Sequence, residues 1–284
     1  MRAEWELNGD LPLSPLKRFT YLARNLRRNM AGLPRSVPFR PFCRGRVEKS
    51  DGTPSPTRFL GQVFIREELP RLLPTAEIRV LDVGCGTGRM SDLLERAGYR
   101  GTYVGVDIDD RFARDGGGTG AFARRFVHGD AHDLTEADSF DLVFSNSALE
   151  HIPNDRRLLA KLDELVAPGG MQVHIVPSGW GLPLYLWHGY RQYPLSRIGL
   201  LFPGEGTRVY GLGGLACFGV HLAFISLGEI LLRMDLRRRI PATYRAFLNT
   251  AFRIDRVFST PPGMYVVCRR SMGDAKQCDE MNDR

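Results

Sequence analysis

The sequence predicts an α/β protein built on a doubly wound, mainly parallel sheet with helices on both faces. Residues 78–83 form a short apolar run rich in β-branched residues, as expected of a parallel strand that is buried on both faces. A glycine-rich turn and a helical pattern follow this run, and strand-like and helix-like segments then alternate. We expect seven strands in this sheet, the last of them in a terminal antiparallel hairpin.

The elements follow one another in a regular order after residue 78. Four apolar residues recur at i, i+3, i+4 and i+7 and predict a helix that ends at Gly98: Met90, Leu93, Leu94 and Ala97. Further strands are expected at 102–106, 126–128, 140–144 and 172–176, and a further helix at 158–166. The two runs of the hairpin are 256–260 and 264–269, joined by a Pro-Pro-Gly turn.

Composition changes along the chain and suggests five segments. We expect a basic N-terminal segment, a core, a cap insertion on the substrate side, the hairpin that completes the core, and a flexible tail. Their predicted bounds are 1–57, 58–178, 179–253, 254–270 and 271–284. The insertion is too long for a plain crossover between strands.

Overall composition bounds the class of protein. The 284 residues are 43% hydrophobic and 25% charged, which excludes wholesale disorder, collagen-like repeats and a polytopic membrane protein. The five cysteines are scattered without a CxxC pair, so we expect neither a disulfide framework nor a metal site. The first ten residues lack an apolar signal region, and we expect a cytoplasmic protein.

The net charge of +7 is unevenly distributed. Residues 1–57 carry 11 basic and 5 acidic groups, and residues 179–270 carry 12 and 4. Residues 58–178 carry 14 basic and 19 acidic groups, so the predicted core is acidic while its two appendages are basic. This distribution favours a basic lid suited to an anionic acceptor or a membrane surface.

One stretch raises the question of a membrane span. Residues 215–232 are largely apolar, but they contain His221 and Glu229, and a charged residue in mid-span is costly. We favour a buried cap helix or the wall of a hydrophobic pocket. The arginines after it leave a peripheral membrane contact open: Arg233, Arg237, Arg238 and Arg239.

The most informative segment is the turn Val-Gly-Cys-Gly-Thr-Gly at 83–88. Gly84, Gly86 and Gly88 permit positive φ angles and close approach of a ligand to the backbone. Arg89 follows directly, so the spacing is G-x-G-x-G rather than the dinucleotide fingerprint, and no Lys-Ser or Lys-Thr pair indicates a P-loop. Acidic residues follow the next two strands: Asp107 lies 23 residues after Gly84, and Asp130 lies 23 after Asp107.

Together with Leu149-Glu-His-Ile152 and Ala167-Pro-Gly-Gly170, these motifs resemble the class I S-adenosylmethionine-dependent methyltransferases, particularly the small-molecule, quinone-biosynthesis-like branch. The resemblance implies a Rossmann-like sheet with S-adenosylmethionine as cofactor. It further implies that residues 82–88 wrap the methionine part, that Asp107 accepts the ribose hydroxyls, and that Asp130 faces the adenine amino group. The cofactor-binding set implied in this way is Asp82, Gly84, Cys85, Gly86, Gly88, Asp107, Ile108, Asp130, Ala131 and Asn146.

Each assignment has a competing interpretation. Asp107 heads a run with Asp109 and Asp110 that is also compatible with a solvated loop, and Asp133 competes with Asp130. Asp82 is expected to order the glycine turn, because a carboxylate at the end of a buried strand needs a partner. Cys85 is interpreted as a small packed residue rather than a nucleophile.

Fewer motifs indicate which residues would bind the methyl acceptor. His151 follows the fourth strand, where the methyl group would point, and is the candidate general base; the alternative is a structural role shared by family members. Six residues of the insertion are candidates for acceptor contact or for plain packing: His188, Tyr190, Arg191, Tyr193, Arg208 and His221.

The sequence therefore predicts in-line methyl transfer to a small-molecule acceptor, by O-methylation of a sugar-containing or lipophilic metabolite. Two alternatives from other classes are an RNA- or anionic-surface-binding protein of the same fold and a catalytically silent scaffold. The basic charge motivates the first, but no zinc motif, recognition helix or aromatic RNA-binding signature accompanies it, so nucleic acid is not the expected partner. A nicotinamide-dependent oxidoreductase ranks last because of Arg89.

Overall fold

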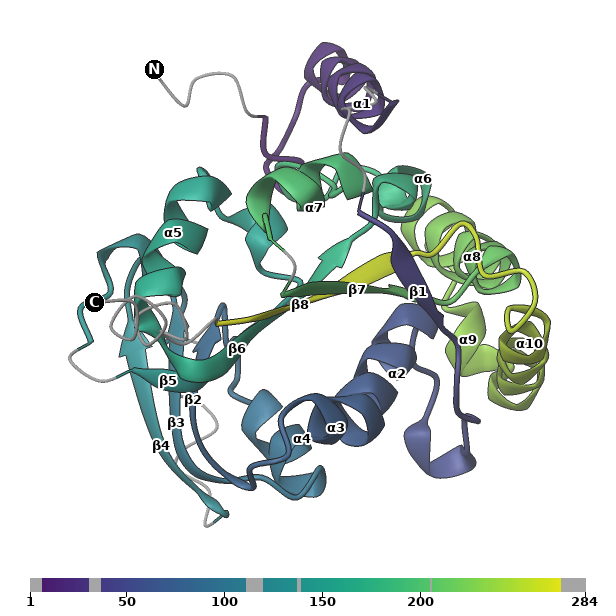
Figure 1. Ribbon diagram of the computed structural model, residues 1–284. Coiled ribbons are helices and arrows are strands. Elements are labelled where there is room, and N and C mark those ends of the chain that lie inside the picture. The colour runs from purple at the N-terminus through teal and green to yellow at the C-terminus, as the bar shows by residue number, and fades with distance from the viewer. Residues whose placement is uncertain (1–6, 31–36, 111–119, 137–138, 205, 272–284) are drawn as a thin grey trace, which may run out of the picture.

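The computed structural model describes residues 7–30, 37–110, 120–136, 139–204 and 206–271. Its centre is one twisted sheet of eight strands in the order β1-β7-β8-β6-β5-β2-β3-β4, with helices on both faces (Figure 1). The strands are β1 (Phe39–Phe42), β2 (Glu77–Val83), β3 (Arg100–Asp107), β4 (Phe122–His128), β5 (Phe140–Asn146), β6 (Val166–Pro177), β7 (Thr207–Leu212) and β8 (Met264–Arg270).

The sheet is doubly wound about β2. From β2 the chain adds β3 and β4 on one side and then β5 and β6 on the other, and all these pairs are parallel. Ligands of such sheets bind where the strand order reverses, outside the carboxyl ends of the strands. The acidic residues that follow β3 and β4 and the glycine turn after β2 all lie at this edge.

The predicted α/β class and doubly wound sheet are confirmed, but the far half of the sheet differs in detail. The described residues form a sheet of eight strands rather than seven, and β8 lies between β6 and β7, antiparallel to both. The expected first run of the hairpin, 256–260, is not a strand. The amides of Val257 and Phe258 both donate to the Ile254 carbonyl at 3.0 Å, which continues the helical turn instead.

Both sequence appendages supply strands to the sheet. β7 comes from the predicted cap insertion, and β1 comes from the N-terminal segment and pairs in parallel with β7. Pro41 is tolerated in β1 because an edge strand needs ladder hydrogen bonds on one side only. The segment boundaries drawn from the sequence stay predictions, but the structure adds that the appendages extend the sheet as well as cover it.

Helices and one-turn segments cover the two faces. The α-helices are α1 (Pro15–Met30), α2 (Pro56–Val63), α3 (Leu69–Leu72), α4 (Met90–Arg96), α5 (Asp155–Leu165), α6 (Leu182–Tyr185), α7 (Leu195–Leu201), α8 (Leu215–His221), α9 (Leu236–Arg239) and α10 (Pro241–Ile254). The π-helical segments are η2 (Phe64–Glu68) and η7 (Leu222–Leu231). The 3-10 segments are η1 (Lys49–Asp51), η4 (Ala131–Asp133), η5 (Leu149–His151) and η6 (Gly179–Gly181).

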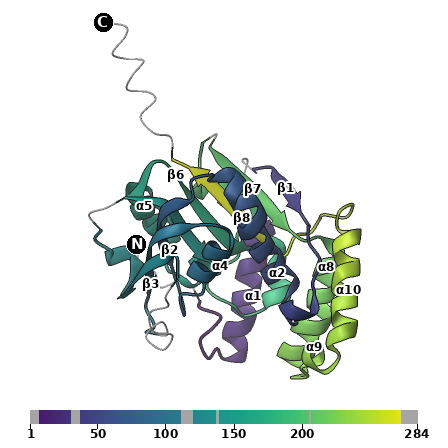
Figure 2. The ribbon, with the colours of Figure 1, turned by 90° about the horizontal axis from the view of Figure 1, so that it is seen from below.

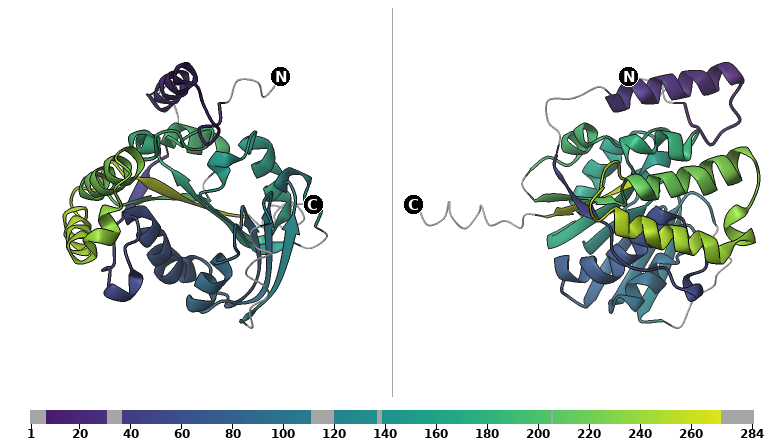
Figure 3. Two further views of the ribbon diagram at one scale, coloured as in Figure 1. Left: turned by 180° about the vertical axis from the view of Figure 1, so that it is seen from behind. Right: turned by 90° about the vertical axis from the view of Figure 1, so that its right-hand side faces the viewer.

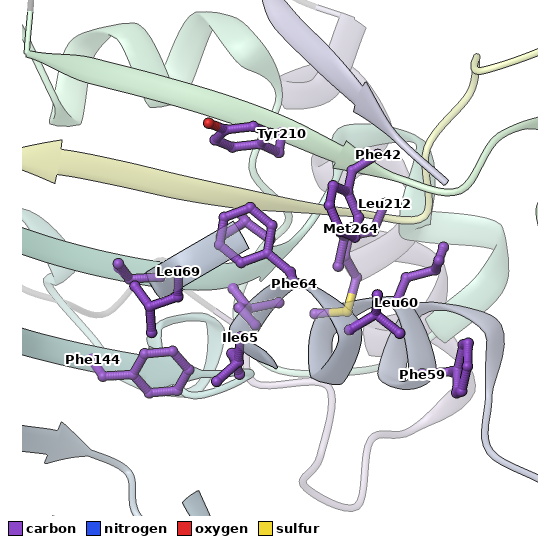
Figure 4. Close-up of a cluster of buried hydrophobic side chains, with 14 of the residues drawn as sticks. Phe42, Phe59, Leu60, Phe64, Ile65, Leu69, Phe144, Tyr210, Leu212 and Met264 are labelled. Carbon is purple, nitrogen blue, oxygen red and sulfur yellow. The ribbon is translucent and has the colours of Figure 1, made fainter. Parts of the chain in front are cut away.

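Two hydrophobic cores lie on opposite faces of the sheet. One packs α2, η2, α4, α8 and α10 against sheet residues such as Phe144 and Tyr210, and Figure 4 shows its aromatic centre around Phe64. The other packs α5 and α7 against residues such as Val143 and Val267. Alternate residues of one strand enter different cores, as in Val80 and Leu81, because side chains of a strand alternate between faces.

The apolar stretch 215–232 forms α8 and continues as η7. Cys217, His221, Ser226 and Gly228 are buried, whereas Leu227, Ile230 and Leu231 are exposed, so the expected buried cap helix has one open face. Within the described part of the chain, no helix has both the length and the apolar character needed to cross a bilayer.

Candidate functional site

The glycine turn joins β2 to α4 and is held against the neighbouring strand. Its three glycines have φ angles of 72°, 56° and 76° at Gly84, Gly86 and Gly88, which residues with a Cβ rarely adopt. The amides of Gly84 and Cys85 both donate to the Val106 carbonyl, at 2.8 and 3.1 Å. The turn is thereby fixed to the carboxyl end of β3.

Asp107 is the last residue of β3, and its side chain forms a hydrogen bond with the glycine turn. Its Oδ2 accepts the amide hydrogen of Gly86 at 2.7 Å, and its Oδ1 accepts that of Asp109 at 2.9 Å. Asp107 is 6% exposed, which distinguishes it from the solvated loop that was its alternative. Both carboxylate oxygens of Asp107 therefore accept backbone amide hydrogens at the carboxyl edge of the sheet.

Two of the three glycines are needed for close packing, whereas the third faces open space. A Cβ at Gly84 would lie 2.4 Å from the Ala148 Cβ, and one at Gly88 would lie 2.6 Å from the Phe126 ring. A Cβ at Gly86 would meet nothing within 4 Å. Gly86 therefore faces open space beside the Asp107 carboxylate, and this uncovered backbone next to an acceptor is a suitable cradle for a polar ligand.

Asp82 has a different partner from the one expected. It is buried near the end of β2, and the Tyr103 hydroxyl of β3 donates to its Oδ2. Burial raises the pKa of Asp82 to about 7, against the lowering effect of the Tyr103 hydrogen bond and with a further rise from Asp107. Asp82 thus joins β2 to β3 rather than binding the backbone of the turn. Cys85 is 8% exposed and packs beneath the turn, where a Cβ at Gly105 would lie 2.8 Å from its Sγ.

Asp130 follows β4 at the same edge, because the Gly129 amide donates to the Asp107 carbonyl at 2.9 Å. Its Oδ1 accepts the His132 amide hydrogen at 2.9 Å and contacts His132 Nδ1 at 2.8 Å, and these contacts lower its pKa. Its side chain is 53% exposed. Ala131 is buried, and the competing Asp133 is exposed in the same 3-10 turn.

Two further predicted positions lie at this edge. Ile108 follows Asp107 and is 70% exposed, and its carbonyl oxygen lies 2.9 Å from His128 Nε2. Asn146 is the exposed last residue of β5, next to β2 in the sheet. The residue after it, Ser147, has a φ of 50° and leads into Ala148, which packs on the glycine turn.

His151 lies at the end of η5, one 3-10 turn beyond Ala148, and belongs to a cluster of titratable groups. Its Nδ1 lies 2.7 Å from Oδ2 of Asp10, and His188 Nδ1 lies 3.3 Å from Oδ1 of the same carboxylate. The Gly189 amide also donates to Asp10 Oδ2 at 3.0 Å. Burial raises the pKa of Asp10, but these hydrogen bonds outweigh it and hold the pKa well below its usual range.

Three distant segments are clamped together here by backbone hydrogen bonds. Gly9 donates to the Gly189 carbonyl, and Tyr190 donates to the Glu150 carbonyl, both at 2.7 Å. A Cβ at Gly189 would lie 2.6 Å from the Glu150 carbonyl oxygen, so this approach requires glycine. Sequence reasoning named His151 and His188 but missed Asp10, because no local pattern links residues that are 141 positions apart.

Glu150 is the buried member of this group. It is 1% exposed, burial raises its pKa, and its Oε2 has no hydrogen-bond partner among the described residues. Its Oε1 lies 4.0 Å from His188 Nε2. Burial thus disfavours the charged form of the Glu150 carboxyl, one oxygen of which has no hydrogen bond to the described residues.

Two groups of side chains have the composition of a metal site. The potential ligand atoms of Asp10, His151 and His188 lie within 4.8 Å of one another, as do those of Cys43, Cys217 and Asp255. In the second group Asp255 accepts amide hydrogens from Gly214, Ala216 and Cys217, which makes it the cap of α8. The absence of a metal requirement stays a prediction.

Three of the other candidates in the insertion are buried side chains: Arg191, Tyr193 and His221. Arg191 and Tyr193 are buried and contact Asp155, by an ion pair at 3.5 Å and a hydrogen bond at 2.9 Å, so they are packing residues. His221 is also buried, with its ring 5.1 Å from that of Tyr185 and its Nδ1 without a hydrogen bond. Desolvation lowers the pKa of His221 to about 4, so it is neutral near pH 7.

Comparison with known proteins identifies the core. Residues 81–173 match the family model described as a methyltransferase domain. The chain is 36% identical over 112 residues to trans-aconitate 2-methyltransferase of Deinococcus radiodurans, covering 39% of this chain and 43% of that protein. It is 31% identical over 131 residues to demethylmenaquinone methyltransferase of Staphylococcus aureus, covering 44% of this chain and 54% of that protein. The chain spans about half the length of these curated relatives.

Among solved structures, the cyclase SpnF has a similar fold, with a TM-score of 0.50 and 17% identity over 92% of this chain and 97% of that one. This likeness extends across both appendages and concerns the fold alone. The core of this chain is therefore a class I methyltransferase domain, as the motifs predicted. Its cofactor is S-adenosylmethionine, and the open cradle of Gly86 and Asp107 suits a ligand with hydroxyl donors and no pyrophosphate.

Proposed function

We propose that the whole chain is an S-adenosylmethionine-dependent methyltransferase that methylates a hydroxyl group of a small molecule. The observation that carries the proposal is the joined arrangement of the glycine turn and Asp107 at the switch point of the sheet. Bound there, the cofactor would supply an activated methyl group. Residues 82–88 would hold its methionine part, Asp107 its ribose, and Ile108, Asp130 and Ala131 its adenine.

The acceptor would lie on the side of η5 and the insertion. Because a sulfonium group leaves readily, holding the acceptor oxygen in line with the methyl group supplies much of the rate. A hydroxyl acceptor also has to lose its proton. The contact with Asp10 supports His151 as the group that takes this proton, since a carboxylate orients the imidazole and stabilises its charged form.

The surroundings also bear on the class of acceptor. Cationic groups predominate in the two appendages that flank this side, with 12 basic and 4 acidic residues in 179–270. Apolar and aromatic side chains accompany them, among them Tyr185 beside His188 and His221. An acceptor that combines apolar surface with an anionic group, such as a lipid-linked sugar or an acidic lipophilic metabolite, fits this composition best.

The test of the cofactor site is calorimetric. Asp107→Ala removes a charged acceptor and should weaken S-adenosylmethionine binding about tenfold or more. Asp107→Asn can keep an acceptor oxygen for the Gly86 amide and controls for loosening of the turn, while Asp110→Ala, at an exposed position three residues on, should bind normally. Unchanged affinity in a folded Asp107→Ala protein would overturn the cofactor assignment.

The test of the reaction uses labelled cofactor and a fractionated extract of the source cells. Transfer should label one small-molecule fraction, and mass analysis should locate the methyl group on oxygen. Release of no S-adenosylhomocysteine with any fraction would count against an enzyme and favour the scaffold interpretation. Label in RNA would overturn the small-molecule acceptor.

A further inference from the structure

Helix α1 presents an apolar and cationic face that nothing in the described structure covers. Its side chains Leu16, Phe19, Leu26 and Met30 are 75%, 71%, 53% and 74% exposed. The opposite face is anchored, because Tyr21 and Asn25 are buried. The exposed apolar residues therefore belong to a helix whose opposite face already packs against the protein.

The charges of this helix are of one sign. It carries Lys17, Arg18, Arg24, Arg27 and Arg28, and the sequence contains no Asp or Glu from residue 11 to residue 47. Lys17 and Arg27 are exposed beside the apolar side chains. A helix that combines exposed Leu, Phe and Met with a cationic flank is suited to lie in the interface of an anionic bilayer.

A second segment has the same character. Within residues 227–240, several large apolar side chains are 38–66% exposed: Leu227, Ile230, Leu231, Leu232, Met234 and Ile240. Arg233, Arg238 and Arg239 are exposed among them, whereas Arg237 pairs with Glu229. This segment runs from the second half of η7 to the start of α10, and Leu227, Ile230 and Leu231 in it are the open face of the predicted cap helix.

Both segments flank the same edge of the sheet. α1 binds the region after β6 through Asn29 to the Gly179 carbonyl at 2.9 Å and through the Tyr21 hydroxyl to the His188 carbonyl at 2.7 Å. η7 binds the same region through Ser226 to the Leu184 carbonyl at 2.6 Å. In Figure 2, α1 and α9 extend toward the same side of the molecule, and Figures 1 and 3 show α1 separated from the helices α8 and α10, with α6 between them in Figure 1.

We propose that α1 and residues 227–240 form one docking surface for an anionic lipid bilayer, with the acceptor side of the protein turned toward the lipid. The cations would contact lipid phosphates while the apolar side chains enter the interface. Docking itself is independent of methyl transfer. Its use, the collection of a lipophilic acceptor from the membrane, rests on the proposed function.

The experiment measures sedimentation of the full chain with vesicles, without cofactor or acceptor, so that its result does not depend on activity. Binding is expected to vesicles of phosphatidylcholine with phosphatidylglycerol, and to weaken steeply with salt. The double variant Leu16→Ser with Phe19→Ser should lower the affinity at least about tenfold, since two exposed apolar groups lose their burial. Lys17→Gln and Arg27→Gln should each lower it about fivefold.

Matched controls make the outcome decisive. Leu200→Ser removes a side chain on α7 that is 54% exposed and should bind vesicles like the parent protein. Absence of binding to the anionic vesicles, or equal binding by the Leu16→Ser and Phe19→Ser double variant, overturns the proposal. A concentration-dependent dimer that dissociates in this double variant, without vesicle binding, would assign the surface to a second copy of the chain instead.

Discussion

The Gly86 amide donates to Oδ2 of Asp107 across 2.7 Å, and this bond adds to the two backbone bonds from Gly84 and Cys85 that hold the glycine turn against the end of β3. It brings together the two groups on which the cofactor assignment depends most, although they lie 21 residues apart in sequence. The amide of Gly86 stabilises the turn, and nothing lies within 4 Å of the position where a Cβ would point, so we propose that a ligand approaches the residue from this side.

Gly86→Ala should therefore separate binding from folding. The new methyl group enters the ligand cradle, and we expect S-adenosylmethionine affinity to fall by about tenfold or more, with only the roughly 1 kcal/mol loss in unfolding free energy that a positive φ imposes on alanine. Gly98→Ala is the matched control, since Gly98 has a φ of 93° and nothing within 4 Å of its Cβ position. Calorimetry and urea unfolding measure the two effects. Equal cofactor affinity in both variants would contradict the assignment.

Asp10 and His151 are expected to act as a pair. Removing the imidazole in His151→Gln should lower kcat about a hundredfold or more, the usual contribution of a general base, with little change in the KM for the cofactor. Asp10→Asn should produce a smaller fall in kcat and alter the acidic limb of its pH profile, because it changes how the imidazole is held. Asp51→Asn, an exposed carboxylate of the same N-terminal segment, is the control. Unchanged pH profiles in both variants would assign His151 a structural role.

Metal removal provides an independent check on the same cluster. If Asp10, His151 and His188 act through protons, then dialysis against a chelator should leave activity and thermal stability unchanged. Added Zn²⁺ should inhibit, because it would compete for the nitrogen and carboxylate atoms that lie within 4.8 Å of one another. Loss of activity on chelation that a divalent ion restores would show that the cluster works as a metal site.

The buried carboxyl of Asp82 makes stability depend on pH in a defined direction. Its folded pKa of about 7 lies above the ordinary 3.8, so between these values the unfolded chain releases a proton that the folded chain keeps. Stability therefore falls as pH rises from about 4 to about 7, by roughly 1.4 kcal/mol for each unit of pKa difference. Asp82→Asn cannot ionise and can still accept from Tyr103. Urea unfolding from pH 5 to 8 should show the variant gaining stability relative to the parent, and parallel curves would contradict this.

His174 acts in the opposite direction. It is fully buried in β6 between Ser145 and Gln172, and burial lowers its pKa to about 3. Between pH 6.5 and about 3, His174 binds a proton in the unfolded chain but not in the folded chain. The free energy of unfolding therefore decreases as pH falls through this range. His174→Gln should flatten this acid slope, whereas the exposed His128→Gln should not. Urea unfolding between pH 4 and 7 measures both slopes.

Some features of the fold and of the candidate site could be predicted from the sequence, and others could not. The glycine turn, Asp107 and Asp130 were predictable because each lies at or just after the carboxyl end of a strand, and parallel strands bring these ends to one edge. The partner of Asp82 was not predictable, since Tyr103 meets it only when β2 and β3 pair in the observed register. The first run of the predicted hairpin was wrong. Residues 256–260 have β propensity, but the amides of Val257 and Phe258 instead continue the last turn of α10.

By itself, the sequence determined the class of fold, the methyltransferase core and the cofactor, because local motifs and strand order carry that information. Only the tertiary structure decided that β1 and β7 extend the sheet, and that Asp10 reaches His151 and His188. The physical reason is the same in both cases. Contacts between segments more than a hundred residues apart depend on how the chain packs, and they leave no spacing or periodicity that can be read along the sequence.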